Sequence, residues 1–120
     1  LKKHGVYILF HTDGKVEQII PDLIDVGIDV LNPVQPDCMD PVEIKEKYGD
    51  KIAIHGTISI QKTLPFGTVE EVRKEVETRI MTVGRGGGLI IAPTHTVDKH
   101  VPIQNILEMY RVAGETKVPT

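Results

Sequence analysis

The fold is decided by residues 51–92, which read KIAIHGTISIQKTLPFGTVEEVRKEVETRIMTVGRGGGLIIA. Residues 51–55 and 88–92 are apolar and rich in Ile, without the strict polar alternation of half-exposed strands. Such runs are typical of strands that are buried on both faces of a parallel sheet. Between them, Thr68 to Glu71 forms a capping box that opens a long amphipathic helix. A helix of this kind supplies the crossover connection that parallel strands require.

The same succession of strand, polar loop and helix occurs four times. The sequence therefore predicts an α/β fold of four consecutive βα units in one domain, residues 1–120. The first helix is expected to begin at Asp13 and to kink or restart at Pro21. The second begins at a capping box over 40–43, and the last covers 102–114. The expected strands are residues 6–10, 28–31, 51–55 and 88–92.

Composition excludes several classes of function. The net charge is -3 and the basic residues are scattered, so we expect no nucleic-acid partner and no binding to an anionic membrane. A single cysteine, Cys38, excludes an internal disulfide and favours a reducing compartment. No apolar run reaches the roughly 20 residues of a membrane-spanning helix. The expectation is a soluble, cytoplasmic protein.

The two kinds of loop differ in composition. The links from helix to strand are short and rich in glycine, whereas the links from strand to helix carry most of the chemically reactive side chains. In parallel α/β folds, ligands bind at the carboxyl ends of the strands, so this asymmetry predicts a site at that edge. The polar residues after the four expected strands are His11, Thr12 and Asp13; Asn32, Gln35 and Asp37; His55, Thr57 and Gln61; and Thr94, His95, Asp98 and His100.

The strongest candidates for catalysis are His11, Asp13 and His95. His11 and Asp13 are two residues apart at the end of a strand, where alternate side chains point the same way. If the last strand curves toward the first, His95 joins them, and two imidazoles with one carboxylate suit an open catalytic zinc site. The same residues also suit a metal-free acid–base pair, because imidazole titrates near neutral pH.

Four further polar residues are candidates for substrate binding. The amides of Asn32 and Gln35 lie in a proline-stiffened loop, Gln61 follows the third strand, and His55 precedes Gly56, which would allow a close approach of the backbone to a ligand. The glycines of 86–88 do not predict a phosphate loop, because they precede a strand and phosphate loops follow one. Cys38 has no cationic neighbour in sequence and is interpreted as a bystander.

Taken in order, seven short segments resemble the uroporphyrinogen decarboxylase superfamily, most closely its branch related to corrinoid-dependent methyltransferases. The resemblance implies a (β/α)8 barrel, of which this chain corresponds to the carboxyl-terminal half, strands 5–8. The segments are His11-Thr-Asp-Gly, Asp29-Val-Leu-Asn-Pro-Val-Gln-Pro, Lys47-Tyr-Gly-Asp, His55-Gly-Thr, Gln61-Lys-Thr-Leu-Pro-Phe-Gly-Thr, Gly86-Gly-Gly and Ala92-Pro-Thr-His.

The departures from the family pattern bear on the chemistry. In the methyltransferases a His-x-Cys pair and a distant Cys bind zinc; by resemblance His11 matches that histidine, Asp13 stands in place of the first Cys, and His95 lies in the region of the second. The resemblance thus implies a metal site with harder ligands. In the decarboxylases, His95 falls on a family histidine, but the segment after His55 differs, and the main aspartate and arginines belong to the amino-terminal half.

Three functions are therefore in competition. The first is transfer of a methyl group between a corrinoid and an acceptor at a zinc-assisted site, with a methylcorrinoid as substrate or partner. The second is decarboxylation of uroporphyrinogen to coproporphyrinogen without a cofactor. The third is a non-catalytic, flavodoxin-like binding domain. We expect the isolated half-barrel to be inactive, and either to form a homodimer through its unpaired sheet edges or to flatten into an open sheet with its helices redistributed.

Overall fold

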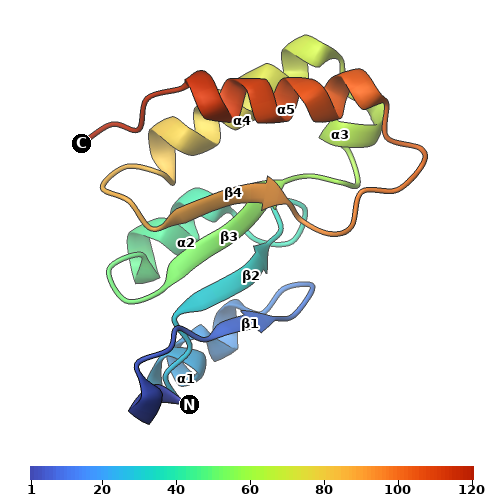
Figure 1. Ribbon diagram of the computed structural model, residues 1–120. Coiled ribbons are helices and arrows are strands. Elements are labelled where there is room, and N and C mark those ends of the chain that lie inside the picture. Colours follow the sequence, from blue (N-terminus) through green and yellow to red (C-terminus); the bar gives the residue numbers. More distant parts are fainter.

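The computed structural model describes residues 1–120, and its centre is a parallel sheet of four strands in the order β1-β2-β3-β4. All four arrows point the same way in Figure 1, so the loops that follow the strands leave from one edge. The strands are β1 (Leu9–His11), β2 (Val30–Val34), β3 (Ala53–Ile58) and β4 (Leu89–Pro93). The helices are α1 (Ile20–Asp25), α2 (Pro41–Tyr48), α3 (Thr63–Phe66), α4 (Val69–Thr82) and α5 (Ile103–Glu115), with 3-10 turns at Lys2–His4 and Glu17–Ile19.

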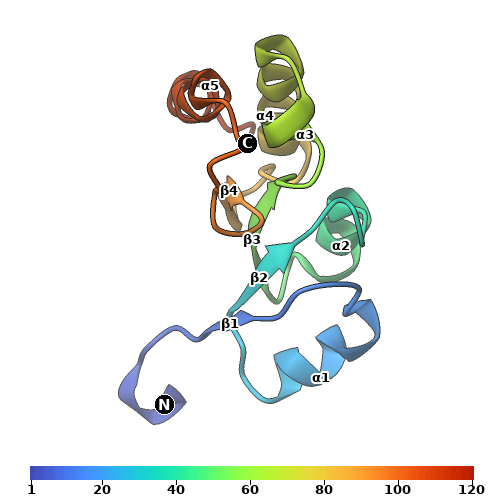
Figure 2. The ribbon, with the colours of Figure 1, turned by 90° about the vertical axis from the view of Figure 1, so that its right-hand side faces the viewer.

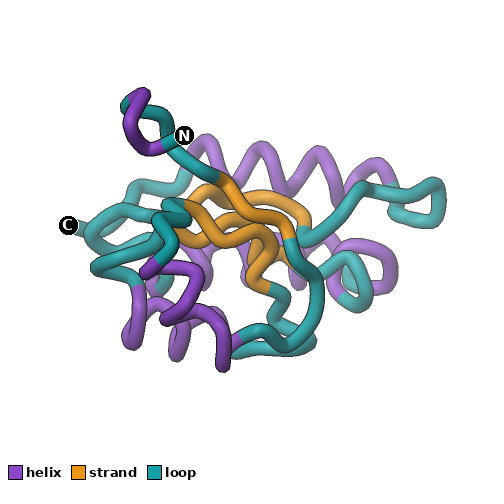
Figure 3. Tube along the Cα trace, turned by 90° about the horizontal axis from the view of Figure 1, so that it is seen from below, coloured by secondary structure: helices purple, strands orange, loops and turns teal.

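The helices are arranged as the outer layer of half a barrel. Figure 2 looks at the carboxyl ends of the strands and shows the helices in an arc from α1 to α5 on one side of the sheet. Seen from below in Figure 3, the strands lie side by side as a curved sheet. The prediction of four βα units forming half of a (β/α)8 barrel is confirmed. The helices are not redistributed, and the sequential strand order differs from the 2-1-3-4-5 order of a flavodoxin-like sheet.

Each strand lies further along the chain than its apolar run predicts. The expected strands at 6–10 and 28–31 become β1 and β2, which end at His11 and Val34, and β3 extends to Ile58. The reason is that pairing with the neighbouring strand, and not side-chain polarity, sets the end of a strand in a parallel sheet. His11 and Asn32, which were predicted to follow their strands, are therefore strand residues, and His55 lies inside β3 and not at its end.

The helix boundaries follow the capping signals to different degrees. The capping box of Thr68 and Glu71 is present at the start of α4 with both hydrogen bonds. Asp40 caps α2 by accepting a hydrogen bond from the backbone of Val42. Asp13 does not cap a helix; the chain makes a 3-10 turn first, and Pro21 then lies in the first turn of the short α1. The predicted restart at this proline is confirmed.

Two apolar clusters hold the helices to the sheet. One contains Leu31 and Ile54 from β2 and β3 together with residues of α1 and α2, and the other joins Ile58 to α4 and α5. Between α4 and α5, Glu108 accepts hydrogen bonds from Arg73 and Arg111. The hydrogen bonds from Arg111, and to a smaller extent the one from Arg73, lower the pKa of Glu108 to about 2.

None of the helices has both the length and the apolar composition required to cross a membrane.

Candidate metal centre

A row of polar side chains crosses the inner face of the sheet near its carboxyl edge. The register pairs His11 of β1 with Asn32 of β2, and pairs Leu31 with Ile54, the residues just before Asn32 and His55. Leu31 and Ile54 are fully buried under the helices. Because side chains alternate along a strand, Asn32 and His55 point to the opposite face, which no helix covers.

His11, Asp13 and His95 meet at the end of this row. Each residue has a ligand atom that lies within 4.8 Å of those of the other two, and all three side chains are exposed. His11 Nε2 lies 3.4 Å from Asp13 Oδ2, and the rings of His11 and His95 are 5.9 Å apart at an angle of 68°. The convergence predicted from the sequence is thus present.

His95 is brought to the cluster by an ordered backbone. The preceding residue, Thr94, is buried; its N–H donates to the carbonyl of Ile58 over 3.0 Å, and its Oγ1 accepts from the N–H of Ile60 over 3.4 Å. These bonds tie the end of β4 to the end of β3. The sheet curvature then directs the next residue, His95, toward β1.

The donor set fits a zinc ion. Two imidazoles and one carboxylate are the ligand types of catalytic zinc sites that keep an open position. Metal–ligand bonds of about 2.0–2.1 Å place tetrahedral ligands about 3.4 Å apart. The pair of His11 and Asp13 already has the spacing of 3.4 Å, whereas the full group spans up to 4.8 Å and must contract slightly around an ion.

Asn32 connects His11 to His55. Its Oδ1 lies 2.6 Å from His11 Nδ1, and its Nδ2 lies 2.6 Å from His55 Nδ1. Burial lowers the pKa of His55, which keeps that imidazole neutral near pH 7. Asn32 and His55 line the same shallow polar depression of about 280 Å³ as His11 and His95.

The other two predicted substrate residues lie outside this row. Gln35 is buried, and its Oε1 accepts a hydrogen bond of 2.7 Å from the N–H of Gly14. It therefore ties the loop after β1 to the loop after β2. Gln61 is exposed and does not line the depression that contains the histidines. Neither amide is brought into the metal cluster by the fold.

The sequence predicts that Gly56 lets the backbone approach a ligand closely. In the structure, Gly56 instead packs against Pro33 of the neighbouring strand. Its φ of +103° lies in the region that favours glycine, and an added Cβ would be 3.2 Å from Pro33 Cβ. Thr57 also has a positive φ of 76°, which is rare for a β-branched residue. Arg79 supports this bend by donating from Nε to the carbonyl of Thr57 over 3.3 Å.

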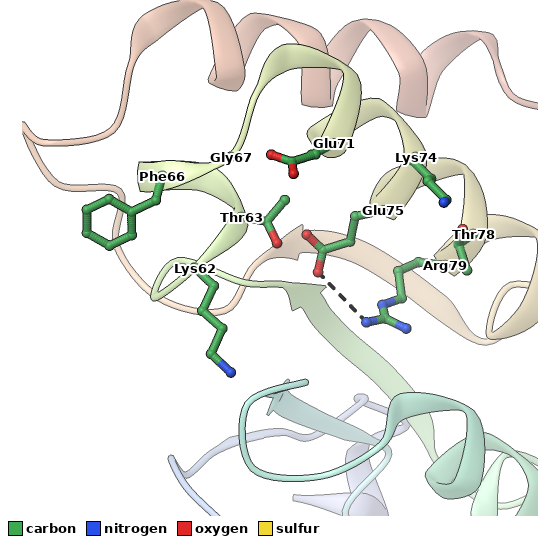
Figure 4. Close-up of a pocket in the computed structure, with 9 residues that line it drawn as sticks. All are labelled: Lys62, Thr63, Phe66, Gly67, Glu71, Lys74, Glu75, Thr78 and Arg79. Carbon is green, nitrogen blue, oxygen red and sulfur yellow. Dashed lines mark ion pairs between the residues drawn. The ribbon is translucent and has the colours of Figure 1, made fainter.

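A second polar cluster, on the helix side of the sheet, was not predicted as a unit. Glu75 Oε1 lies 3.8 Å from Arg79 Nη2, and Ser59 Oγ donates to Asp37 over 2.8 Å. Figure 4 shows Glu75 and Arg79 on α4, beside the groove between α3 and α4. Burial raises the pKa of Glu75. The sequence did contain a signal for this cluster. Glu75 and Arg79 follow Val72 by three and seven positions, a spacing that places them on the same face of the helix as that buried valine.

Comparisons with known proteins agree with this architecture. The family model of uroporphyrinogen decarboxylase (URO-D) matches residues 1–116. No curated protein matches the chain. A solved structure described as a methyltransferase from Methanosarcina mazei superimposes with a TM-score of 0.74 at 22% sequence identity, over 91% of this chain and 31% of that one. The chain therefore spans about a third of that protein's length, and at this identity the likeness describes the fold.

Proposed function

The chain belongs to the uroporphyrinogen decarboxylase family, and on that premise we propose that the protein transfers a methyl group between a corrinoid and an acceptor at a metal-assisted site. The site consists of His11, Asp13 and His95 at the carboxyl edge of the sheet. Catalytic sites of (β/α)8 barrels are built at this edge. The structural neighbour is itself described as a methyltransferase, which supports the same class of reaction.

One observation carries the proposal. Residues at or just beyond the carboxyl ends of the first and last strands, far apart in sequence, place two imidazoles and a carboxylate within 4.8 Å of one another. Their side chains are exposed, so a cation and a substrate have direct access.

Bound zinc would supply a Lewis acid that lowers the pKa of an acceptor such as a thiol, so that the acceptor attacks as an anion. The residues of the chain hold the site and orient it. His11 and His95 would each offer a ring nitrogen, and Asp13 would offer a carboxylate oxygen. His11 and His95 line an open polar depression of about 280 Å³, which gives an acceptor access to the cluster.

The test is metal analysis of the complete protein followed by an assay of methylcobalamin demethylation with a thiol acceptor, for the natural protein and for His95→Ala. We expect bound zinc and acceptor-dependent demethylation that the substitution abolishes. A protein that binds no metal and does not demethylate methylcobalamin would rule the proposal out.

Decarboxylation of a tetrapyrrole is the second candidate, because the matching family model is described as uroporphyrinogen decarboxylase. In that case no cofactor is required, and the polar row of His11, Asn32 and His55 would contact the substrate's carboxylates and pyrrole nitrogens. Conversion of uroporphyrinogen to coproporphyrinogen by metal-free protein would decide in favour of this candidate. Loss of that conversion in His95→Ala would place His95 in it.

We further propose that a second copy covers the open sheet edges when the 120-residue chain is isolated. In β1, Leu9 is 50% exposed, and on α5 Ile103, Leu107 and Tyr110 form an apolar stripe that is 63–69% exposed. Unpaired edges and apolar stripes of this kind favour association. Sedimentation should report a dimer, whereas a monodisperse monomer would contradict this proposal.

A further inference from the structure

We propose that Asn32 is a positioning residue that fixes the tautomers of His11 and His55, so that His11 presents Nε2 to the metal. This inference rests on the proposed metal site and names the residue that prepares it. It follows from the two short hydrogen bonds of one amide group, whose two ends have opposite chemistry.

The oxygen end of the amide determines the state of His11. Asn32 Oδ1 accepts hydrogen bonds and cannot donate them, and it lies 2.6 Å from His11 Nδ1. A neutral His11 ring that donates to this oxygen carries its proton on Nδ1, and its lone pair is then on Nε2. That atom lies 3.4 Å from Asp13 Oδ2, on the side of the candidate ion. Metal-binding histidines are commonly oriented through the second ring nitrogen in this way.

The nitrogen end of the amide determines the state of His55. Asn32 Nδ2 donates hydrogen bonds and lies 2.6 Å from His55 Nδ1, so that this nitrogen must accept. The neutral His55 ring consequently carries its proton on Nε2. With the amide in this orientation, the unprotonated Nδ1 of His55 holds the nitrogen end of Asn32, and the oxygen end faces His11. His55 thus acts on the metal ligand through Asn32.

The sheet itself places these three residues together. His11 and Asn32 are paired in register, and neighbouring strands in a sheet are about 4.8 Å apart, a distance that suits a side-chain hydrogen bond. Asn32 is half-buried between the two imidazoles, and both ends of its amide are engaged by them. Asn32 is therefore placed to orient the metal ligand His11 and not to bind a substrate.

The experiment reads the tautomers directly, without metal. Nitrogen-15 NMR of the histidine rings in the metal-free protein should give a protonated Nδ1 for His11 and a protonated Nε2 for His55. Zinc titration with a competing chromophoric chelator then measures affinity. In Asn32→Ala, we expect His11 to shift to a mixture of tautomers and zinc affinity to fall by about 10–100-fold, the usual effect of losing an outer-shell partner.

Asn32→Asp separates the two ends of the amide and retains the shape of the side chain. Its carboxylate still accepts from His11, so the His11 tautomer and zinc affinity should resemble those of the natural protein, while His55 Nδ1 becomes the protonated nitrogen. Gln104→Ala, an exposed amide on α5, is the control and should change neither signal.

A protonated Nε2 on His11 in the natural protein, or unchanged tautomers in Asn32→Ala, would overturn the inference. Because the NMR measurement needs neither zinc nor a methyl donor, its outcome is independent of the proposed reaction. If the tautomers are as expected and zinc does not bind, the proposed function fails and the role of Asn32 in orienting His11 stands.

Discussion

Two polar clusters lie near the carboxyl edge of the sheet, one on each face, and they differ in how their charges are satisfied. On the inner face, His11, Asp13 and His95 converge at the surface with an open side. On the helix side, Glu75 and Arg79 face each other with only 12% and 17% of their side chains exposed. The contrast is between a buried ion pair on the helix side and an exposed group of possible metal ligands on the inner face, for which we propose a metal site.

The largest effect is expected for His95→Ala. This substitution leaves only two ligands, His11 at the end of β1 and Asp13 in the loop after it, so zinc affinity should fall by more than about 100-fold, beyond the loss caused by outer-shell changes. Because the side chain is exposed, the free energy of unfolding without metal should change by less than about 0.5 kcal/mol. Chelator competition and urea denaturation measure the two quantities.

His4→Ala is the matched control, since His4 is exposed in the amino-terminal 3-10 turn. It should leave zinc affinity unchanged. An equal loss of affinity in both variants would mean that zinc binds to scattered surface histidines, which contradicts the distinction between the clusters.

The next effect is expected for Arg79→Met on the helix side. It removes the cation beside Glu75 and the hydrogen bond to the carbonyl of Thr57, which supports the bend after Gly56. The free energy of unfolding should fall by about 2–3 kcal/mol. This is less than the loss of about 3–5 kcal/mol that follows when one partner of a fully buried ion pair is removed. Zinc affinity should remain unchanged. A variant that loses zinc binding at full stability would show that the two faces are coupled.

A smaller effect is expected for Glu75→Gln, and it depends on pH. Burial raises the folded-state pKa of Glu75 above its ordinary value, so the folded protein binds the proton more tightly than the unfolded chain does. The stabilisation from this proton is complete below the unfolded pKa and is lost as pH rises through the folded pKa. Glutamine does not ionise, so Glu75→Gln should remove the loss of stability that accompanies ionisation of Glu75 and should stabilise the protein at neutral pH. Thermal unfolding measured across pH checks this prediction.

Glu108→Gln is expected to have the opposite dependence on pH, because it removes a stabilisation that is present at neutral pH. Hydrogen bonds from Arg111 and Arg73 lower the pKa of Glu108 from 4.5 to about 2. Its stabilisation is therefore present above about 4.5 and lost as pH falls toward about 2. The variant should be less sensitive to acid in that window. If both Glu variants showed the same pH slope, the assignment of a buried Glu75 would be wrong.

The sequence predicted the repeated units and the site better than the element boundaries. Apolar runs, capping boxes and glycines located the four βα units, and the one-sided loops located the edge where His11, Asp13 and His95 meet. The register in which the strands pair could not be predicted from the sequence, because it depends on contacts between strands that are distant in sequence. For that reason Asn32 was interpreted as a loop residue, and its position between His11 and His55 was missed.

Glu75 and Arg79 were missed for a related reason. Their spacing on α4 indicated one face, but charged residues on a helix are usually solvated. Only the packing of α4 beside Ser59 and Asp37 makes them a buried pair. Tertiary contact, and not local pattern, thus distinguishes a structural charge from a solvated one.

The central claim is that one metal ion binds between the first and last strands of the sheet. Zinc-edge X-ray absorption spectroscopy of the purified, zinc-loaded protein tests it most directly, with His95→Ala as the comparison. The account predicts one zinc per chain with two imidazole ligands and one carboxylate oxygen, and one imidazole fewer in the variant. A spectrum without imidazole ligands, or one that His95→Ala leaves unchanged, would contradict it.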